Sequence, residues 1–292
     1  KELDADIVIA TDPDADRVGI AVKDAQGEWV LVNGNQTAAL LTHYLVSARQ
    51  QAGQLRTDKD YIVYTIVTSD VLGDVARHHG IRSFQTLTGF KYIAGIIRGF
   101  EQQNDGHYYI GGGEESYGYM IGQFVRDKDA VSACCLIAEM AAVAKDQGRT
   151  LYEEMAQMYR TYGLYKEDLI SLTKKGQRGA EEIQEMMAGL RQNPPASLGG
   201  SPVVQLLDYQ QQIARDLRTG ETTTLDHEKS NVLQFLTEDG SKVSARPSGT
   251  EPKIKFYFSL KQPNFGADES FEDALAGLDA RIKQIIQEMQ LQ

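Results

Sequence analysis

The sequence predicts a layered α/β domain with a mostly parallel sheet, followed by an α+β domain with an antiparallel sheet. Two observations carry this prediction. Up to residue 162, short runs of β-branched residues alternate with longer segments in which apolar residues recur at helical spacing. After Gly163, strand patterns follow one another with few helices between them, and some alternate polar and apolar residues as half-buried antiparallel strands do.

The first half is expected to contain both kinds of element in alternation. The strands are predicted at residues 7–10, 18–22, 29–32, 61–67, 81–87 and 108–110. The helices are predicted at residues 35–51, 69–79, 90–102, 129–146 and 151–162. Ser69 is expected to cap the second of these helices, and Gly80 to end it.

The second half is expected to be rich in strands. These are predicted at residues 169–172, 203–207, 232–236, 242–245 and 254–260, with a hairpin turn at 238–240. Helices are predicted at 180–191 and 271–289. The change in pattern places a domain boundary near residues 164–168.

Composition excludes several classes of protein. The chain has 292 residues, with 41 acidic against 30 basic side chains and a net charge of −11. This argues against a general nucleic-acid binder, but it leaves room for a small phosphorylated ligand held by a few cations. No apolar run approaches the ~18 residues of a membrane span.

The two cysteines and the start of the chain give two further expectations. Cys134 and Cys135 are adjacent, which excludes a disulfide framework and favours a reducing, cytoplasmic compartment. The chain begins with Lys1 and enters a strand within a few residues, so we expect it to be a piece of a longer protein.

An acidic loop follows the first predicted strand. Asp12, Asp14 and Asp16 alternate along it, so their carboxylates can converge on a hard cation such as Mg²⁺. An EF-hand is excluded, because Arg17 and Lys23 stand where that loop needs Gly and Glu. A plain acidic surface turn is the alternative, although a guanidinium beside the carboxylates favours a phosphate site.

A glycine-rich segment, residues 111–118, follows the strand at 108–110. Its Glu114 and Ser116 are suitably spaced to bind vicinal hydroxyls of a sugar, and a flexible glycine turn is the alternative. Arg126 and Lys128 come shortly before the next helix and are expected to be either phosphate contacts or surface cations.

Two other segments offer groups that bind anions. The loop at residues 246–253 combines a guanidinium, hydroxyls and a glycine between two strands, which is typical of an anion nest; a plain hairpin loop is the alternative. The segment at 86–91 is a strand-to-helix turn where Lys91 and the helix N-terminus favour an anion, or where the chain simply caps its helix.

Taken together and in this order, these motifs resemble those of the α-D-phosphohexomutases, in particular the phosphoglucomutase/phosphomannomutase branch. The acidic loop is similar to the family's metal loop, residues 113–116 to its sugar loop, and residues 246–253 to its C-terminal phosphate loop. Residues 88–91 and 126–129 also match family positions that line the cleft. The family's Thr-Ala-Ser-His-Asn-Pro loop, whose serine carries the phosphoryl group, does not occur in the sequence.

The resemblance implies an organisation in three parts. Residues 1–34 would be the end of the second mutase domain with the metal loop, 35–165 the third α/β domain with the sugar loop, and 166–292 the C-terminal phosphate-binding domain. The first domain and most of the second would lie outside this chain, which alone would be inactive.

The resemblance also implies roles for individual residues. Mg²⁺, one per active site, would be bound by Asp12, Asp14 and Asp16, and Arg17 would steady the transferring phosphoryl group. The residues expected to hold substrate are Thr88, Lys91, Glu114, Ser116, Lys128, Arg246, Ser248, Gly249 and Thr250.

The implied reaction interconverts hexose 1-phosphate and hexose 6-phosphate through a phosphoserine enzyme, with glucose 1,6-bisphosphate as activator and intermediate. The expected partner is thus a small sugar phosphate, with neither nucleic acid nor membrane. A phosphopentomutase of the same family, a metal-dependent sugar-phosphate phosphatase using an aspartate nucleophile, and a non-catalytic sugar-phosphate binder are the alternatives.

Overall fold

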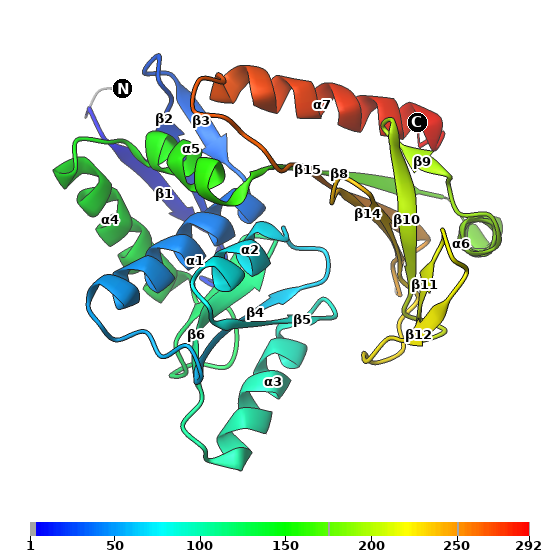
Figure 1. Cartoon of the computed structure of the whole chain (residues 1–292), viewed down its shortest axis with the longest axis horizontal. Coiled ribbons are helices and arrows are strands. Elements are labelled where there is room, and N and C mark those ends of the chain that lie inside the picture. The colour runs from blue at the N-terminus through cyan, green and yellow to red at the C-terminus, as the bar shows by residue number, and fades with distance from the viewer. Residues whose placement is uncertain (1–3, 175, 250, 292) are drawn as a thin grey trace. The chain divides into compact units, whose positions relative to one another are not determined.

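The structure, a computed structural model, describes residues 4–174, 176–249 and 251–291. It divides into two units, Lys1–Tyr162 and Gly163–Gln292 (Figure 1). The three-part organisation expected from the sequence, with boundaries after residues 34 and 165, remains a prediction.

The first unit opens with a three-stranded antiparallel sheet. It consists of β1 (Ile7–Thr11), β2 (Val18–Lys23) and β3 (Trp29–Val32), paired in that order. Val18, Ile20 and Val22 alternate along β2 and are all buried, as expected for a sheet with one face on the core. Helix α1 (Gly34–Gln51) then begins at a capping box formed by Asn33 and Gln36.

A four-stranded sheet forms the centre of this unit. The strand order is β5 (Arg82–Thr86), β4 (Asp60–Thr65), β6 (Tyr108–Glu114), β7 (Gly118–Ile121), with β4 parallel to both β5 and β6. The predicted parallel sheet is confirmed, but β7 is an addition that the sequence did not indicate, and it runs antiparallel to β6. Every residue of β4 is buried, as is usual for a central parallel strand.

Helices cover both faces of this sheet. Tyr61 and Val63 of β4 join a core cluster with Phe90 and Ile93 of α3 (Phe90–Gln103). The next residue, Tyr64, points to the other face, where its hydroxyl lies against Gly73 of α2 (Val71–His78). Figure 1 shows α1 and α2 on one side of the sheet and α3 on the other; α4 (Ala130–Asp146) and α5 (Leu151–Tyr162) complete the unit.

One expected helix start is shifted. The first residue of α2 is Val71 and the N-cap position is Asp70, whose side chain makes no capping hydrogen bond. The hydroxyl of Ser69, one residue earlier, accepts the N–H of Val71 at 3.5 Å, so Ser69 still contributes to the helix start. Its backbone N–H donates to Asn35 Oδ1 of α1, at 2.8 Å.

The second unit is built on one large antiparallel sheet. Its strand order is β12 (Thr222–Thr224), β11 (Ile213–Asp216), β10 (Ser201–Asp208), β13 (Leu233–Thr237), β14 (Lys242–Pro247), β15 (Lys253–Gln262), β8 (Leu164–Thr173), and the short β9 (Ser197–Leu198) pairs with β10. The antiparallel α+β domain is confirmed, whereas β9, β11 and β12 were not expected.

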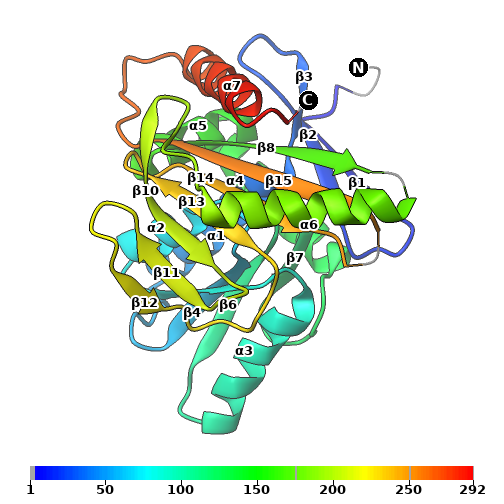
Figure 2. The same ribbon diagram turned by 90° about the vertical axis from the view of Figure 1, so that its right-hand side faces the viewer.

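Two helices accompany this sheet, α6 (Gly176–Gln192) and α7 (Phe271–Glu288) (Figure 2). The core contains the fully buried Phe235, Phe256 and Phe258 of the central strands. In neither unit does a helix of the described residues have the length and apolar character needed to cross a membrane.

Candidate functional site

The acidic loop between β1 and β2 is a preformed turn. Asp12 Oδ1 accepts the backbone N–H groups of Asp16 and Arg17, each at 3.2 Å, and Ala15 at its tip has a φ of 54°. Burial raises the pKa of Asp12, but these N–H donors outweigh it, so its pKa lies below the ordinary value. The Asp12 carboxylate therefore organises the loop as well as supplying an oxygen to it.

Lys128 ties this loop to two other segments. Its ammonium lies 3.1 Å from Asp16 Oδ2 and 2.9 Å from Asp127 Oδ1, with only 14% of the side chain exposed. It also lies 5.1 Å from the centre of the Phe90 ring, at the start of α3. Burial lowers the pKa of Lys128, but the two carboxylates raise it further, so it remains a cation.

Glu114 links the β6–β7 turn to the start of α3. Its side chain is 6% exposed, and Oε1 accepts the backbone N–H of Gly89 at 2.6 Å. Gly89 has a φ of 123°, a conformation that favours glycine. The half-buried Ser116 lies in the same turn.

The expected glycine loop is wrong in part, because residues 111–114 belong to strand β6. A Cβ at Gly112 would lie 1.8 Å from Val63 O of β4, and one at Gly113 would lie 2.3 Å from Gly118 O of β7. These glycines are thus required by close strand packing, and the turn itself is confined to residues 115–117.

The start of α3 carries two of the expected substrate residues. Thr88 Oγ1 is buried and has no hydrogen-bond partner in the described part of the chain. Lys91 Nζ lies 4.6 Å from the centre of the Tyr92 ring. An unsatisfied buried hydroxyl at a helix N-terminus is a group that a ligand can complete.

Backbone bonds lock the acidic loop against the β6–β7 turn. Val18 N–H donates to Tyr117 O at 3.1 Å, and Arg17 forms an isolated β-bridge with Gly118. Ala130 N–H, at the start of α4, donates to Ala15 O at 3.1 Å. The structure therefore brings together four segments of the first unit that the sequence analysis singled out: residues 12–17, 88–91, 114–118 and 126–128.

The cations of this cluster differ in how they are used. Arg17 is 53% exposed, with Nε 3.8 Å from Asp16 Oδ1. Arg126 instead pairs with Glu101 and donates to the carbonyls of Gln123 and Val125. It therefore stabilises the segment between β7 and α4 to which it belongs.

The acidic loop has the donors that a divalent cation needs, although its three carboxylates do not converge on one point. Its ligands are all carboxylates, which suit Mg²⁺. Among residues 4–174, 176–249 and 251–291, however, no three acidic, histidine or cysteine side chains gather around one point. Asp12 accepts backbone N–H groups, and Asp16 pairs with Lys128. The exposed Asp14 is thus the carboxylate of this loop that contributes least to its structure.

The predicted phosphate loop connects β14 and β15 in the second unit. Ser248 N–H donates to Lys253 O at 2.7 Å, and Ser248 Oγ accepts the N–H of Glu251 at 3.3 Å. Gly249 is exposed, and Thr250 lies outside the described residues. The loop is therefore closed chiefly by its own backbone.

Arg246 stands directly opposite Lys255 in the β14–β15 ladder, so two cations share one face of the sheet. Like charges in such cross-strand pairs repel each other. An anion placed between them would relieve this repulsion.

A residue that sequence reasoning missed shapes the β6–β7 turn. A Cβ at Gly34, the first residue of α1, would lie 1.9 Å from Glu115 O. Only glycine lets α1 approach the turn so closely. The sequence signal was the glycine between Asn33 and Asn35, at the N-terminus of a predicted helix.

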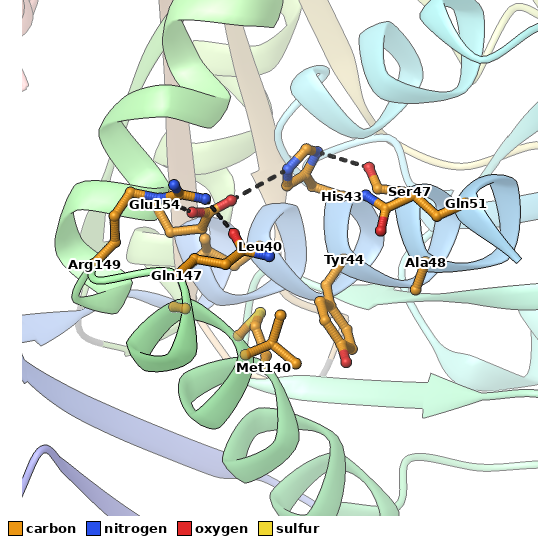
Figure 3. A pocket seen from close by; sticks show the side chains of 12 residues that line it. Leu40, His43, Tyr44, Ser47, Ala48, Gln51, Met140, Gln147, Arg149 and Glu154 are labelled. Atoms are coloured by element: carbon orange, nitrogen blue, oxygen red, sulfur yellow. Dashed lines mark hydrogen bonds and ion pairs between the residues drawn. The ribbon is translucent and has the colours of Figure 1, made fainter.

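A separate cavity of about 180 Å³ lies between α1, α4 and α5 (Figure 3). Glu154 crosses it, 3.8 Å from His43 Nε2 and 2.7 Å from Arg149 Nε. The neighbouring His43 and the guanidinium of Arg149 hold the pKa of Glu154 below its ordinary value. None of the residues expected to bind metal or substrate lines this cavity.

Comparison with known proteins bears on this geometry. Residues 33–162 match the family model for the phosphoglucomutase/phosphomannomutase alpha/beta/alpha domain III. The chain is 42% identical over 261 residues to phosphoglucomutase of Staphylococcus aureus strain MRSA252, covering 89% of this chain and 46% of that protein. The chain is therefore similar to the phosphoglucomutase/phosphomannomutase branch of the α-D-phosphohexomutases over most of its length.

Solved structures of the family share the fold. Parafusin, a phosphoglucomutase from Paramecium in an open form, superposes with a TM-score of 0.61 at 20% identity, covering 98% of this chain and 45% of that one. A phosphomannomutase assigned in Thermus thermophilus gives 0.58 at 20% identity, covering 96% and 46%. The chain spans about half the length of the curated relatives it matches.

Proposed function

We propose that this chain supplies the metal, sugar and phosphate loops of a phosphoglucomutase/phosphomannomutase, which interconverts hexose 1-phosphate and hexose 6-phosphate. The observation that carries the proposal is the cluster around Lys128. It gathers an acidic loop, a helix N-terminus and a polar turn that lie far apart in the sequence. The 42% identity to a Staphylococcus aureus phosphoglucomutase supports the same reaction class.

The cluster provides the groups that phosphoryl transfer requires. Its transition state spreads negative charge over several oxygens, so fixed cations and N–H donors near those oxygens lower the barrier. Arg17 is the exposed cation beside the acidic loop, and we assign it to the transferring phosphoryl group. Lys128 is held by Asp16 and Asp127, so it maintains a positive charge at a fixed position.

Sugar recognition is assigned to the turn and to the start of α3. The unsatisfied hydroxyl of Thr88 and the hydroxyl of Ser116 are suited to sugar hydroxyl or phosphate oxygens. Glu114 both fixes Gly89 and places a carboxylate at the turn. Lys91 adds a cation in the first helical turn, where anions are already favoured.

The second phosphate of a bisphosphate intermediate is assigned to the 246–253 loop. Arg246 faces Lys255 across the ladder, so this sheet face attracts an anion. Ser248, Gly249 and Thr250 supply hydroxyl and backbone donors around it.

Mg²⁺ is assigned to Asp12, Asp14 and Asp16, where a bound ion would neutralise developing phosphate charge. Mg²⁺ usually binds through one or two carboxylates with water and phosphate oxygens completing its shell. The engaged states of Asp12 and Asp16 therefore lead us to expect weak binding in the absence of a phosphate ligand.

The phosphoryl donor is assigned to a phosphoserine outside these 292 residues, because no Ser-His-Asn-Pro loop occurs among them. The chain alone is then expected to bind sugar phosphate without turning it over. The free thiols of Cys134 and Cys135 suit the cytoplasmic compartment included in this proposal.

Phosphorus NMR tests the proposal on the protein that contains this chain. With Mg²⁺ and glucose 1,6-bisphosphate, glucose 1-phosphate is expected to be converted to glucose 6-phosphate, and parallel runs with mannose and ribose phosphates define the sugar. Release of inorganic phosphate by the chain alone, abolished by Asp12→Asn, would instead establish the phosphatase alternative. Binding without either reaction would establish a sugar-phosphate binder.

A further inference from the structure

A second cavity, of about 290 Å³, lies within the second unit. It is formed by the C-terminal end of α6 and by β10 and β11, which lie beside that helix in Figures 1 and 2. Its polar lining residues are Arg191, Gln192, Asp208, Gln211 and Arg215. The site proposed above uses none of them.

The carboxylate in this cavity is already satisfied. Asp208 is 1% exposed; its Oδ2 accepts from Arg191 Nε at 2.8 Å, and its Oδ1 accepts the N–H groups of Gln210 and Gln211 at 3.0 and 3.2 Å. Arg191 also donates to Asn231 Oδ1 at 2.9 Å. The charges of Arg191 and Asp208 therefore compensate each other, and the pair lines one side of the cavity.

Arg215 has no such compensation. Its Nε is buried and lacks a hydrogen-bond partner in the described part of the chain. Its cross-strand neighbours are Leu206 on β10 and Thr222 on β12, neither of which carries a charge. Buried donors are almost always paired, so a charged donor left unpaired beside a cavity indicates a missing acceptor.

The cavity is distinct from the phosphate loop of the same sheet. Asp208 pairs with Leu233, and Leu233 pairs with Ala245, so these three side chains share one face. Arg246 follows Ala245 and points to the opposite face, because successive strand residues alternate. A ligand in the cavity therefore lies across the sheet from Arg246.

We propose that this cavity is a binding site for a small oxyanion, a phosphate or carboxylate group of a metabolite. Arg215 is its principal contact, and the amides of Gln192 and Gln211 are further donors. The guanidinium fork suits two oxygens of one anion. The C-terminal end of α6 carries partial negative charge, so binding depends on the uncompensated charge of Arg215.

Nitrogen-15 NMR of the 292-residue chain tests this site directly. The Nε–Hε signal of Arg215, assigned by its loss in Arg215→Met, is expected to shift and saturate on titration with inorganic phosphate or with malonate. The anion that binds more tightly shows whether the site prefers a phosphate or a carboxylate group. The absence of a saturating shift with both anions would overturn the proposal.

Calorimetry with matched variants separates this cavity from the loop at 246–253. In an Arg246→Ala background, Arg215→Met is expected to weaken binding of the stronger anion at least tenfold. Arg218→Met, which removes an equal charge from an exposed position paired with Asp216, is expected to change it less than twofold. Equal losses in both variants, or none in Arg215→Met, would overturn the proposal whatever the fate of the proposed mutase function.

Discussion

The candidate loops of the two units use their cations in opposite ways. In the first unit, Lys128 is bonded to Asp16 and Asp127, so its charge is balanced within the protein. In the second unit, Arg246 stands opposite another cation, Lys255, in the β14–β15 ladder. The first arrangement stabilises the fold before any ligand arrives, whereas the second gains stability only when an anion binds.

The largest effect is expected for Lys128→Met. The change leaves Asp16 and Asp127 without their cation and loosens the acidic loop, so the free energy of unfolding should fall by roughly 1.5–3 kcal/mol, the range for hydrogen bonds to charged groups. Urea unfolding at neutral pH measures it. Lys91→Met is the control, because its ammonium lies over the Tyr92 ring, a contact whose loss should cost about 0.5–1 kcal/mol. Equal losses would show that Lys128 has no special structural role.

Arg246→Ala should give the opposite pattern. Sugar-phosphate affinity is expected to fall by roughly 1.5–3 kcal/mol, as for loss of a charge-assisted hydrogen bond. The free energy of unfolding should stay within about 0.5 kcal/mol, because the change also removes a repulsive pair. Calorimetry with glucose 1-phosphate measures the affinity, and urea unfolding measures the free energy of unfolding. Loss of stability with unchanged affinity would reduce the loop to a plain hairpin.

The contrast between the units also shows what sequence can predict. Helix periods and β-branched runs predicted both fold classes, and α5 was placed at its observed bounds. The hairpin of β11 and β12 was not predicted, because Ile213–Asp216 and Thr222–Thr224 are short and largely polar. Pairing with neighbouring strands, rather than their own sequence pattern, makes these segments strands.

The same limit applies to the site. Alternating carboxylates and a glycine run marked the segments that meet around Lys128. That Asp12 accepts N–H groups of its own loop is a local contact that a pattern of alternating carboxylates does not reveal. That Gly112 is required by Val63 O of the adjacent strand depends on a contact between distant segments. Residue type indicated the segments that form the proposed site, and tertiary packing decided which of their side chains also stabilise the fold.

Asp14→Ala tests how the three carboxylates of the acidic loop differ in role. Asp14 is exposed, whereas Asp12 accepts two backbone N–H groups of the loop and Asp16 pairs with Lys128. Alanine at this position should therefore remove a proposed metal ligand without disturbing the loop. Mg²⁺ affinity is expected to fall roughly tenfold or more. Calorimetry with MgCl₂ measures this, with Asp58→Ala, another exposed aspartate of the first unit, as control. Identical affinity in wild type and Asp14→Ala would contradict the metal assignment.

The smallest expected effect is a pH dependence of the first unit, centred on His79. This side chain lies between α1 and α5, with Nδ1 2.8 Å from Gln50 Oε1 and Nε2 3.0 Å from the Tyr162 hydroxyl. Burial, and then the nearby charges of His78 and His43, hold its pKa below the ordinary value of 6.5. The unfolded chain therefore takes up a proton first as the pH falls.

Stability from the neutral form of His79 is consequently complete above about pH 6.5 and declines as the pH drops through that value toward the lower folded pKa. His79→Gln removes this titration, so the loss of stability between pH 7 and pH 5 should be smaller in the variant than in wild type. Urea unfolding at both pH values measures the difference. Protonation of His79 would place a donor instead of an acceptor opposite the Tyr162 hydroxyl. An unchanged pH dependence in His79→Gln would mean that this hydroxyl pairs equally well with both states of the ring. The protonation of His79 would then have no effect on stability.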